Sequence, residues 1–435
     1  MQKKESNILK LFEQENNKIN EFEIIKSIFT TSGAWLISII TLLSIKFLMK
    51  DIITKELYDL FLTIIIYSFI FSMIITAPFI NMINRYLGDK IYLKEYDSIL
   101  PIFISSFILI APVSYLSSFY YVRYFTNLGD FSFVIAQFFT SLSILWLIMI
   151  FITIFKHFAI INFSFLIGMI ISIVLIKYLF HDDLYSLILG FNSGVLFTVS
   201  VLVAKLKYDF TFRSYFDFSF LKEKKYYLFF LSGLLLYLAL WTDKFMYWAS
   251  GYGVEIEKGF YFFPEYDFVI FISYLVIIPV NSYLTVYIND VFNIEQKQYF
   301  KAIENKKSFA IINNFARNLQ NTFYRGIFKI TLFQFIISLL FVFSIHYFFD
   351  KFNINVESIP MLRIVVFAIT IQMILMAIIV FLYYFDFQKE IFFISLCYFI
   401  LNFSFSYFMV NLSYDYIGYS YFISALLTLF IAFII

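Results

Sequence analysis

Apolar segments long enough to cross a lipid bilayer recur along the whole chain. A helix needs about 20 predominantly apolar residues to span the hydrocarbon core. Twelve such segments can be identified, at residues 28–48, 58–80, 99–119, 131–153, 158–180, 184–204, 226–248, 266–289, 326–348, 361–381, 391–410 and 415–435. Each must be an α-helix because lipid cannot satisfy an open backbone, and their continuous rather than alternating hydrophobicity argues against a barrel. The sequence predicts an all-α integral membrane protein.

The composition agrees with this class and excludes several functions. Hydrophobic residues make up 62% of the chain and charged residues 14%, whereas soluble domains have about 45–50% and 25%. The net charge of +2 and the lack of a basic block give no indication of nucleic-acid binding. With one cysteine, Cys397, no intrachain disulfide is possible. We find no catalytic motif, phosphate-binding loop or metal-ligand spacing, so neither an enzyme nor a cofactor is expected.

The distribution of basic residues predicts the orientation. Of the 32 Lys and Arg residues, 22 lie in the N-terminal segment and the even-numbered loops. Basic residues concentrate on the cytoplasmic side of membrane proteins, so the N-terminus, and with twelve spans also the C-terminus, is expected in the cytoplasm. The first 27 residues are charged and polar, which gives no sign of a cleavable signal peptide.

The chain is predicted to comprise a cytoplasmic amphipathic segment (1–27), an N-lobe of six spans (28–204), a cytoplasmic linker (205–225) and a C-lobe of six spans (226–435). The C-lobe includes a cytoplasmic helical loop, 290–325. Its apolar residues are spaced 3, 4, 3 and 4 apart, as on one helix face: Phe309, Ile312, Ala316, Leu319 and Phe323. Two interpretations stay open for this face: contact with the membrane surface or the helix bundle, and docking of a cytosolic partner.

An internal repeat is predicted from matching sequence positions. SGAWLIS begins at Ser32 and SGLLLYL at Ser232. In each half, a proline follows that serine by 46 or 47 residues and an aspartate follows the proline by 11: Pro78 and Asp89, Pro279 and Asp290. Since six spans separate the halves, both enter the membrane from the same side. A parallel pseudo-twofold repeat would place a substrate path between two lobes.

Several stretches resemble the PelG family of inner-membrane transporters. They are TTSGAWLISII (30–40), ITAPFINMINRYLGDKIYLKEYDSILP (75–101), LWTDKFMYW (240–248), YDFVIFISYLVIIP (266–279) and DVFNIEQKQYFKAI (290–303). Ala34 stands where the family usually has proline, which puts a helix bend in doubt but not the family.

The resemblance implies a MATE-like fold and a role in the export of Pel, a partly de-acetylated, N-acetylgalactosamine-rich polysaccharide of the biofilm matrix. It also implies a bacterial inner-membrane location. The implied partners are membrane lipid, a cytosolic glycosyltransferase and further membrane subunits of a Pel-type synthase.

Adjacent charges in the seventh span are the main candidates for the substrate path. Asp243 and Lys244 lie in its outer third beside Trp241, and charges in a span are functional candidates because they are costly there. Neighbours on a helix point about 100° apart, so these two cannot pair with each other. Asp243 could face the path and meet a cation; alternatively, Lys244 extends to the surface and Asp243 pairs locally. Asp267 and Tyr274 in span eight are further path candidates.

Three other groups of residues complete the predicted site. Glu255, Glu257 and Glu265 in the loop after span seven would form an acidic outer mouth that attracts a cationic polymer, although acidic outer loops also follow from the positive-inside rule. Arg85, Asp89 and Asp290 at the cytoplasmic ends of spans two and eight would form an inner gate, or else a solvated loop. Pro78 and Pro279 are candidate hinges because proline removes a backbone hydrogen bond.

Two other functions remain compatible with the sequence. One is a flippase for a lipid-linked oligosaccharide, which would require basic side chains for a pyrophosphate; mid-span cations are few. The other is a non-transporting scaffold for a polysaccharide synthase. A scaffold would tolerate loss of Asp243 but not of the helix face in loop 290–325.

Overall fold

The structure is a computed structural model that describes the chain except for residues 1–20, 50–51, 156, 180–182, 211–214 and 353–357. Among the described residues, twelve helices are long and apolar enough to cross a membrane. Each overlaps one predicted segment, so the predicted number of spans is confirmed for this part of the chain. The chain is a multi-pass membrane protein.

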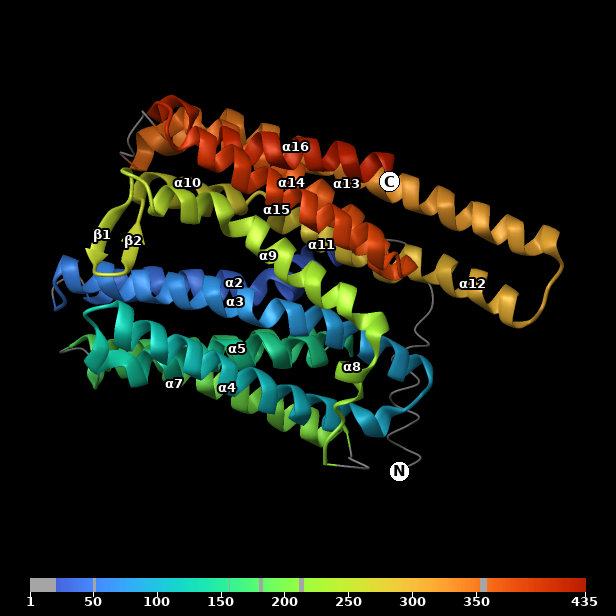
Figure 1. The fold of residues 1–435 in the computed structure, drawn as a ribbon, viewed down its shortest axis with the longest axis horizontal. Helices are drawn as coiled ribbons and strands as arrows, with labels where there is room; N and C mark the ends of the chain where they lie inside the picture. The colour runs from blue at the N-terminus through green and yellow to red at the C-terminus, as the bar shows by residue number, and fades with distance from the viewer. Residues whose placement is uncertain (1–20, 50–51, 156, 180–182, 211–214, 353–357) are drawn as a thin grey trace. The chain divides into compact units, whose positions relative to one another are not determined.

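Most spans consist of one helix (Figure 1). These are α2 (Glu21–Met49), α3 (Lys55–Tyr92), α4 (Ile99–Phe125), α5 (Ser132–Ile154), α6 (Phe158–Tyr178), α7 (Leu184–Asp209), α9 (Tyr227–Trp248), α13 (Phe309–Phe352), α14 (Ile359–Phe385), α15 (Gln388–Met409) and α16 (Tyr419–Ile434). The eighth span is composite and comprises α10 (Pro264–Tyr274), α11 (Ile277–Tyr287), a π-helix (Ile288–Phe292) and α12 (Asn293–Glu304). Two short elements were not predicted: helix α8 (Ser219–Lys222), and a hairpin of antiparallel strands β1 (Val254–Glu257) and β2 (Phe260–Phe262).

Side chains satisfy backbone groups at several helix ends. The Thr54 hydroxyl accepts a hydrogen bond from the Leu57 backbone N–H at 3.3 Å at the start of α3, and the Asp183 carboxylate accepts one from Ser186 at 2.8 Å at the start of α7. Both are N-caps, which satisfy donors that have no partner within the helix. Helix α14 ends at Asp386, whose φ of 61° turns the chain out of the helix.

Hydroxyl groups inside the spans bond to their own helices. Ser38 donates to the carbonyl of Ala34 at 2.9 Å, Thr76 to that of Ser72 at 2.7 Å and Ser395 to that of Ile391 at 2.8 Å. This bond to the carbonyl four residues earlier satisfies a hydroxyl without a second helix. Serine and threonine in a span therefore do not by themselves identify a substrate path.

The helices pack into two compact units, which consist chiefly of Gly33–Phe263 and of Pro264–Ile435. In the first unit the strongest pairings are α6 with α7, α4 with α5 and α3 with α9. In the second, α14 contacts α10, α13 and α16. This division differs from the predicted one at 205–225, because α9 packs against α3 in the first unit. The superposition of spans one to six on spans seven to twelve stays a prediction.

Glycines allow α6 and α7 to approach closely. A Cβ atom on Gly194 would lie 2.0 Å from the carbonyl oxygen of Gly168, and one on Gly168 would lie 2.5 Å from that of Gly194. Beside this contact, Ser172 donates to the Phe191 carbonyl at 3.0 Å. Small residues commonly form such interfaces in membranes, where packing rather than hydrophobicity holds helices together.

We predict that Gly194→Ala destabilises the protein by about 1–3 kcal/mol, because the added methyl group must separate α6 from α7. Gly88→Ala is the matched control, since a Cβ on Gly88 in α3 has no atom within 4 Å and alanine favours a helix. Thermal unfolding of the detergent-purified variants measures both effects. Equal unfolding temperatures for the two variants would contradict the predicted contact.

Candidate functional site

Both charges of the seventh span are buried. Asp243 is 1% exposed and Lys244 is 7% exposed near the end of α9. The Lys244 ammonium lies 5.1 Å from the ring centroid of Trp241, in a cation–π arrangement. Lys244 therefore does not extend to the surface, which rules out the first part of the alternative interpretation. Asp243 is likewise enclosed rather than presented to lipid.

The two charges lie on different faces of α9. Gly233 marks the face that contacts α3, since a Cβ there would lie 2.7 Å from the carbonyl oxygen of Ala77. Lys244 follows Gly233 by 11 residues, close to three helical turns, and so shares that face. Asp243 is rotated by about 100° away from α3. A role for Asp243 on a substrate path is compatible with this direction and stays a prediction.

Aromatic rings line the α3–α9 contact along its length. Phe79 meets Phe230 edge to face with centroids 5.2 Å apart. Farther along, two pairs stack almost parallel: Phe71 on Phe245 at 5.1 Å and Tyr67 on Trp248 at 4.8 Å. Such ring pairs add to the packing of small residues at Gly233. The contact is a continuous, closely packed interface.

At the other end of this interface, Asp89 joins α3 to the start of α9. Its carboxylate accepts hydrogen bonds from Tyr226 at 2.7 Å and Lys225 at 3.1 Å. We call these three residues the Asp89 latch. Arg85, one turn earlier on α3, lies 3.2 Å from the same carboxylate. The predicted gate residues Arg85 and Asp89 thus contact each other, with partners from the segment before span seven that the sequence did not indicate.

A second contact fixes the linker beside the Asp89 latch. Tyr86 donates to the Asp217 carboxylate at 2.9 Å, and the Asp217 N–H donates to Ser105 on α4 at 2.8 Å. The Asp217 carboxylate also accepts a bond from the Ser219 N–H at 2.9 Å, at the start of α8. The composition of the linker gave no signal for these contacts, because Asp217 is one of several polar residues there.

The other predicted gate and hinge residues lie in different settings. Asp290 is exposed and belongs to the π-helix of the second unit, so its predicted place in an inner gate stays a prediction. Pro78 lies within the unbroken helix α3. Pro279 follows the interruption between α10 and α11 at residues 275–276. That position is expected, because proline cannot bond to the carbonyl of residue 275.

The β1–β2 hairpin is held by side chains of α3 and α4. The Tyr67 hydroxyl accepts a hydrogen bond from the Tyr261 N–H at 2.8 Å and donates to the Tyr261 carbonyl at 3.0 Å. Tyr121 donates to the Gly259 carbonyl at 2.6 Å. Gly259 has a φ of 84°, which glycine adopts without strain in this turn. Strand β2 and the turn of the hairpin are therefore fixed to α3 and α4.

The predicted acidic residues take part in specific hydrogen bonds. Glu257 accepts a bond from Asn127 at 2.9 Å, and Glu255 lies close enough to Tyr261 to raise the pKa of that phenol. Glu265, in the second unit, bonds to the Tyr414 hydroxyl. The grouping of these carboxylates into one outer mouth stays a prediction.

A buried polar cluster in the second unit contains the other path candidates. Asp267 is 6% exposed on α10, and Tyr274 follows it by two turns on the same face. The Tyr274 hydroxyl lies 3.4 Å from the Gln372 side chain and 3.4 Å from the Tyr421 hydroxyl. Gln372 and Tyr421 were missed, although a glutamine within the long apolar run of α14 was a usable signal.

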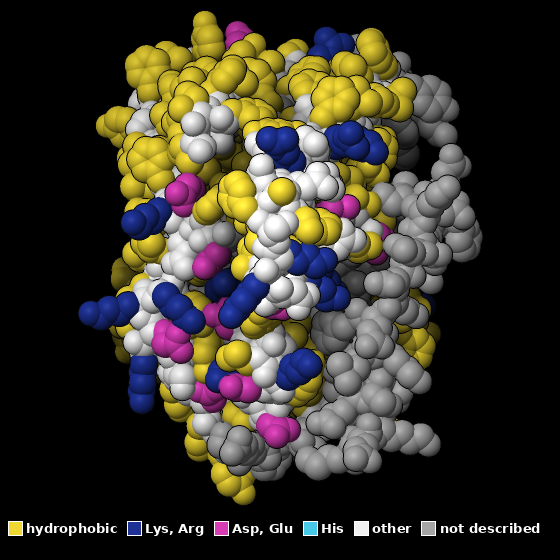
Figure 2. All heavy atoms as spheres, turned by 90° about the vertical axis from the view of Figure 1, so that its right-hand side faces the viewer, with side chains coloured by type: hydrophobic (Ala, Val, Ile, Leu, Met, Phe, Trp, Pro, Cys, Tyr) yellow, Lys and Arg dark blue, Asp and Glu magenta, His cyan; other side chains and the backbone are white. Residues whose placement is uncertain are grey.

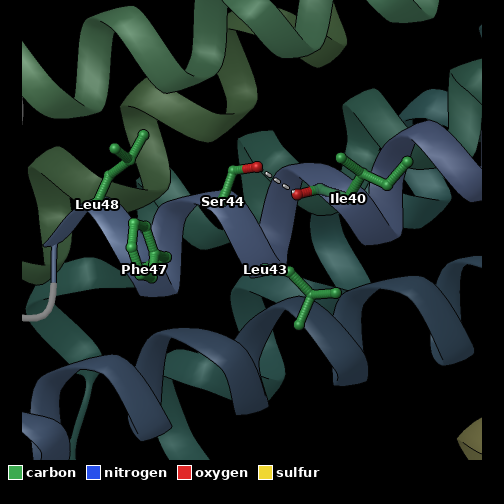
Figure 3. A pocket seen from close by; sticks show the side chains of 5 residues that line it. All are labelled: Ile40, Leu43, Ser44, Phe47 and Leu48. Carbon is green, nitrogen blue, oxygen red and sulfur yellow. Dashed lines mark hydrogen bonds between the residues drawn. The ribbon is translucent and has the colours of Figure 1, made fainter.

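Two hollows lie apart from these residues. The first, of about 370 Å³, is lined by residues of α2 (Figure 3): Ile40, Leu43, Ser44, Phe47 and Leu48. Its only polar side chain, Ser44, donates to the Ile40 carbonyl at 2.7 Å. The second, of about 210 Å³, lies around Lys46, Tyr58 and Asp59. Neither includes a predicted path residue. Within the described ranges, no three His, Cys, Asp or Glu side chains are grouped as metal ligands.

Three ionisable groups meet where α5, α6 and α7 approach each other. His157 Nε2 lies 3.4 Å from an Asp209 carboxylate oxygen, and the other oxygen of that group lies 2.7 Å from Lys205 Nζ. Burial and the Lys205 charge lower the pKa of His157 from its usual 6.5, and Asp209 opposes them only in part. Folding therefore favours neutral His157.

We predict a loss of stability as the pH falls through about 6.5, because the unfolded chain then binds a proton that the folded chain binds less well. His157→Gln should remove this part of the pH dependence. Unfolding temperatures between about pH 5 and 8 measure it. If the unfolding temperatures of the wild type and the variant change with pH in the same way, His157 does not contribute to the pH dependence of stability.

Comparisons with known proteins agree with these features. The sequence model of one family, described as "PelG: Putative exopolysaccharide Exporter (EPS-E)", matches residues 7–435. No curated protein matches the sequence closely enough to count as a relative.

Solved structures of MATE and other MOP-superfamily transporters are similar. An outward-facing MATE-family multidrug resistance transporter has a TM-score of 0.67 at 11% identity, over 95% of this chain and 94% of that one. A MOP-superfamily transporter from Pyrococcus furiosus has a TM-score of 0.62 at 11% identity, over 95% of this chain and 94% of that one. An inward-facing MATE-family multidrug resistance transporter has a TM-score of 0.57 at 12% identity, over 98% of this chain and 97% of that one. At these identities the likeness shows the fold alone, and the predicted MATE-like fold is confirmed. Family and fold are those of transporters, not enzymes.

Proposed function

The chain belongs to the PelG family, and on that premise we propose that it moves the Pel exopolysaccharide across the bacterial cytoplasmic membrane for biofilm matrix formation. The observation that carries the proposal is the family match over residues 7–435. The twelve apolar helices supply the membrane-embedded body that such a carrier requires. In this proposal both termini lie in the cytoplasm, where the basic residues of the loops concentrate.

The α3–α9 interface is proposed to open and close the cytoplasmic end of the path. Its closed form is stabilised by close packing at Gly233 and by the charge-assisted hydrogen bonds of the Asp89 latch. Bonds of that kind contribute about 1.5–3 kcal/mol when sheltered and less where water competes. Asp89 and Lys225 are partly exposed, so the latch can be broken at modest cost. A closure that opens and closes reversibly requires such a low cost of breaking the latch.

Acidic groups are proposed to assist a cationic polymer. A partly de-acetylated aminosugar chain carries ammonium groups, which carboxylates attract. Asp243 is a buried carboxylate within a span, and Glu255 and Glu257 lie on a hairpin between spans. The proposed partners are a cytosolic glycosyltransferase, which supplies the polymer, and membrane subunits of a Pel-type synthase.

We predict that Asp89→Asn opens the cytoplasmic end of the α3–α9 interface, because the carboxylate that holds Lys225 and Tyr226 loses its charge. Asn81→Cys provides the reporter, since Asn81 lies against Gly233 in this interface, and Cys397→Ser removes the single native thiol. Labelling by an impermeant maleimide in inside-out vesicles should accelerate by up to about tenfold.

Glu95→Gln is the matched control, because it breaks the nearby Lys90–Glu95 pair, of 2.6 Å, without affecting α9. Its labelling rate should equal that of the parent. If Asp89→Asn also leaves the rate unchanged, the latch does not control access to this interface.

We predict that Asp243→Asn, and separately the triple change E255Q/E257Q/E265Q, lowers polymer secretion several-fold at unchanged protein level. The triple control E56Q/D130N/D415N neutralises three exposed acidic residues, two in predicted outer loops and one at the outer start of the predicted twelfth span, and should secrete normally. Secreted and cell-associated aminosugar are both measured.

The alternatives give different results. A non-transporting scaffold would tolerate Asp243→Asn. A flippase for a lipid-linked sugar would accumulate that lipid intermediate instead of cell-associated polymer. Normal secretion by both acidic variants would contradict the proposed role of the carboxylates.

A further inference from the structure

Helices α12 and α13 form a projecting arm, residues 297–322, beyond the body of the second unit. Its base is fixed by aromatic contacts with the last turn of α14. The ring centroid of Phe381 lies 4.9 Å from that of Phe292 and 5.2 Å from that of Phe323. Gln296 donates to the Tyr384 carbonyl at 2.8 Å. Residues 292–296 and 323 therefore mark the level at which α14 ends.

The arm extends well past that level. Helix α13 runs without interruption from Phe309 to Phe352, 44 residues, and at about 1.5 Å per residue its portion before Phe323 is about 20 Å long. Figure 1 shows α12 and the adjoining end of α13 reaching past the ends of α14, α15 and α16. The interfacial layer of a bilayer is only about 5–8 Å thick on each side. Measured along α13, the arm is therefore longer than this layer is thick.

The tip carries large apolar side chains that nothing in the described chain covers. Phe309 is 82% exposed and Phe300 48%, with Ile303 and Ile311 also exposed beside them. Of the predicted apolar face, by contrast, Leu319 is buried and Phe323 packs at the base. Exposure along this face thus decreases toward the base: Phe309 is fully available to a partner, Ile312 and Ala316 are half-buried, and Leu319 is buried. Exposed apolar clusters on a soluble surface commonly mark interaction sites.

Four lysines surround the apolar tip: Lys297, Lys301, Lys306 and Lys307. All are exposed, and among the described residues none forms an ion pair. Figure 2, which views the side toward which α12 and α13 point, shows Lys and Arg side chains interspersed with hydrophobic and acidic ones; within the arm the acidic residue is Glu304. The tip is therefore basic as well as apolar.

The turn that presents this surface is a closed structure. Lys306 adopts a φ of 48°, and the N–H groups of Lys306 and Lys307 donate to the carbonyls of Ile303 and Ala302 at 2.9 and 3.0 Å. These bonds cap the end of α12. A preformed surface loses little conformational entropy when a partner binds.

We propose that the arm tip docks a cytosolic protein whose surface offers an apolar groove rimmed by Asp and Glu. The lysines repel a cationic polymer and a second copy of the same tip, and the arm is longer than the interfacial layer is thick, so an acidic protein surface is the complementary occupant. The identity of the partner as the polymer-supplying glycosyltransferase rests on the proposed function. Docking would hold the exit of that enzyme near the cytoplasmic end of the carrier.

Photo-crosslinking in polymer-producing cells tests this proposal. A benzophenone amino acid replaces Phe309 in the full chain, and the glycosyltransferase is tagged. Replacement of Phe387 is the matched control, because this phenylalanine is also exposed, at 48%, and lies in the turn between α14 and α15, outside the arm. We expect an adduct with the glycosyltransferase from position 309 and none from position 387.

Charge reversal provides the second measurement. The variant K297E/K301E/K306E/K307E should reduce the adduct at least fivefold. K94E/K207E/K222E/K389E, which reverses four exposed lysines outside the arm, should not. Both variants are compared at equal protein level and equal elution volume in detergent, so that misfolding is recognised.

Any other result at position 309 overturns the docking proposal: adducts only with phospholipid, with a second copy or with residues 1–20 of the same chain, or no adduct. This outcome leaves export itself intact if polymer is still secreted. Conversely, an adduct with the glycosyltransferase in cells whose Asp243→Asn and E255Q/E257Q/E265Q variants secrete normally would support docking and contradict the proposed role of the carboxylates.

Discussion

Hydrocarbon offers a peptide group no hydrogen-bond partner, and this constraint governs the whole molecule. Every span has to be a helix, and hydroxyl groups within the spans bond to their own backbone, as Ser38, Thr76 and Ser395 do. Where the backbone leaves the helix within a span, at residues 275–276, a proline three residues later has already removed one donor. Elsewhere, short elements such as α8 and the β1–β2 hairpin lie between spans.

Contacts between helices then depend on shape rather than on hydrophobicity. Lipid chains are as apolar as leucine, so helices associate where small residues allow close approach or where polar groups meet. Gly194 and Gly168 do so for α6 and α7, and Gly233 does so for α9 on α3. The α3–α9 contact also decides the environment of Lys244. Because this residue shares the face of Gly233, its ammonium is enclosed beside Trp241 instead of reaching the surface.

The candidate site was only partly predictable. Asp89 and Arg85 could be selected because charges next to a span end are conspicuous, and their mutual contact follows from a spacing of four residues. Lys225, Tyr226 and Asp217 could not be selected, because they are brought to α3 by the path of the linker. Tyr67 could not be distinguished from other tyrosines, since its contacts with Tyr261 join positions 194 residues apart.

The sequence by itself determined the class of protein, the number and approximate limits of the spans, and the family. These properties follow from local hydrophobicity and from matching motifs, which require no knowledge of distant contacts. The tertiary structure alone decided that α9 packs with α3, that Asp243 is turned away from this contact, and that residues 297–322 of the predicted cytoplasmic loop form an arm that projects past the end of α14. The reason is physical: an apolar helix can present many faces to its neighbours at similar cost, and the choice is made by side-chain shape at each crossing.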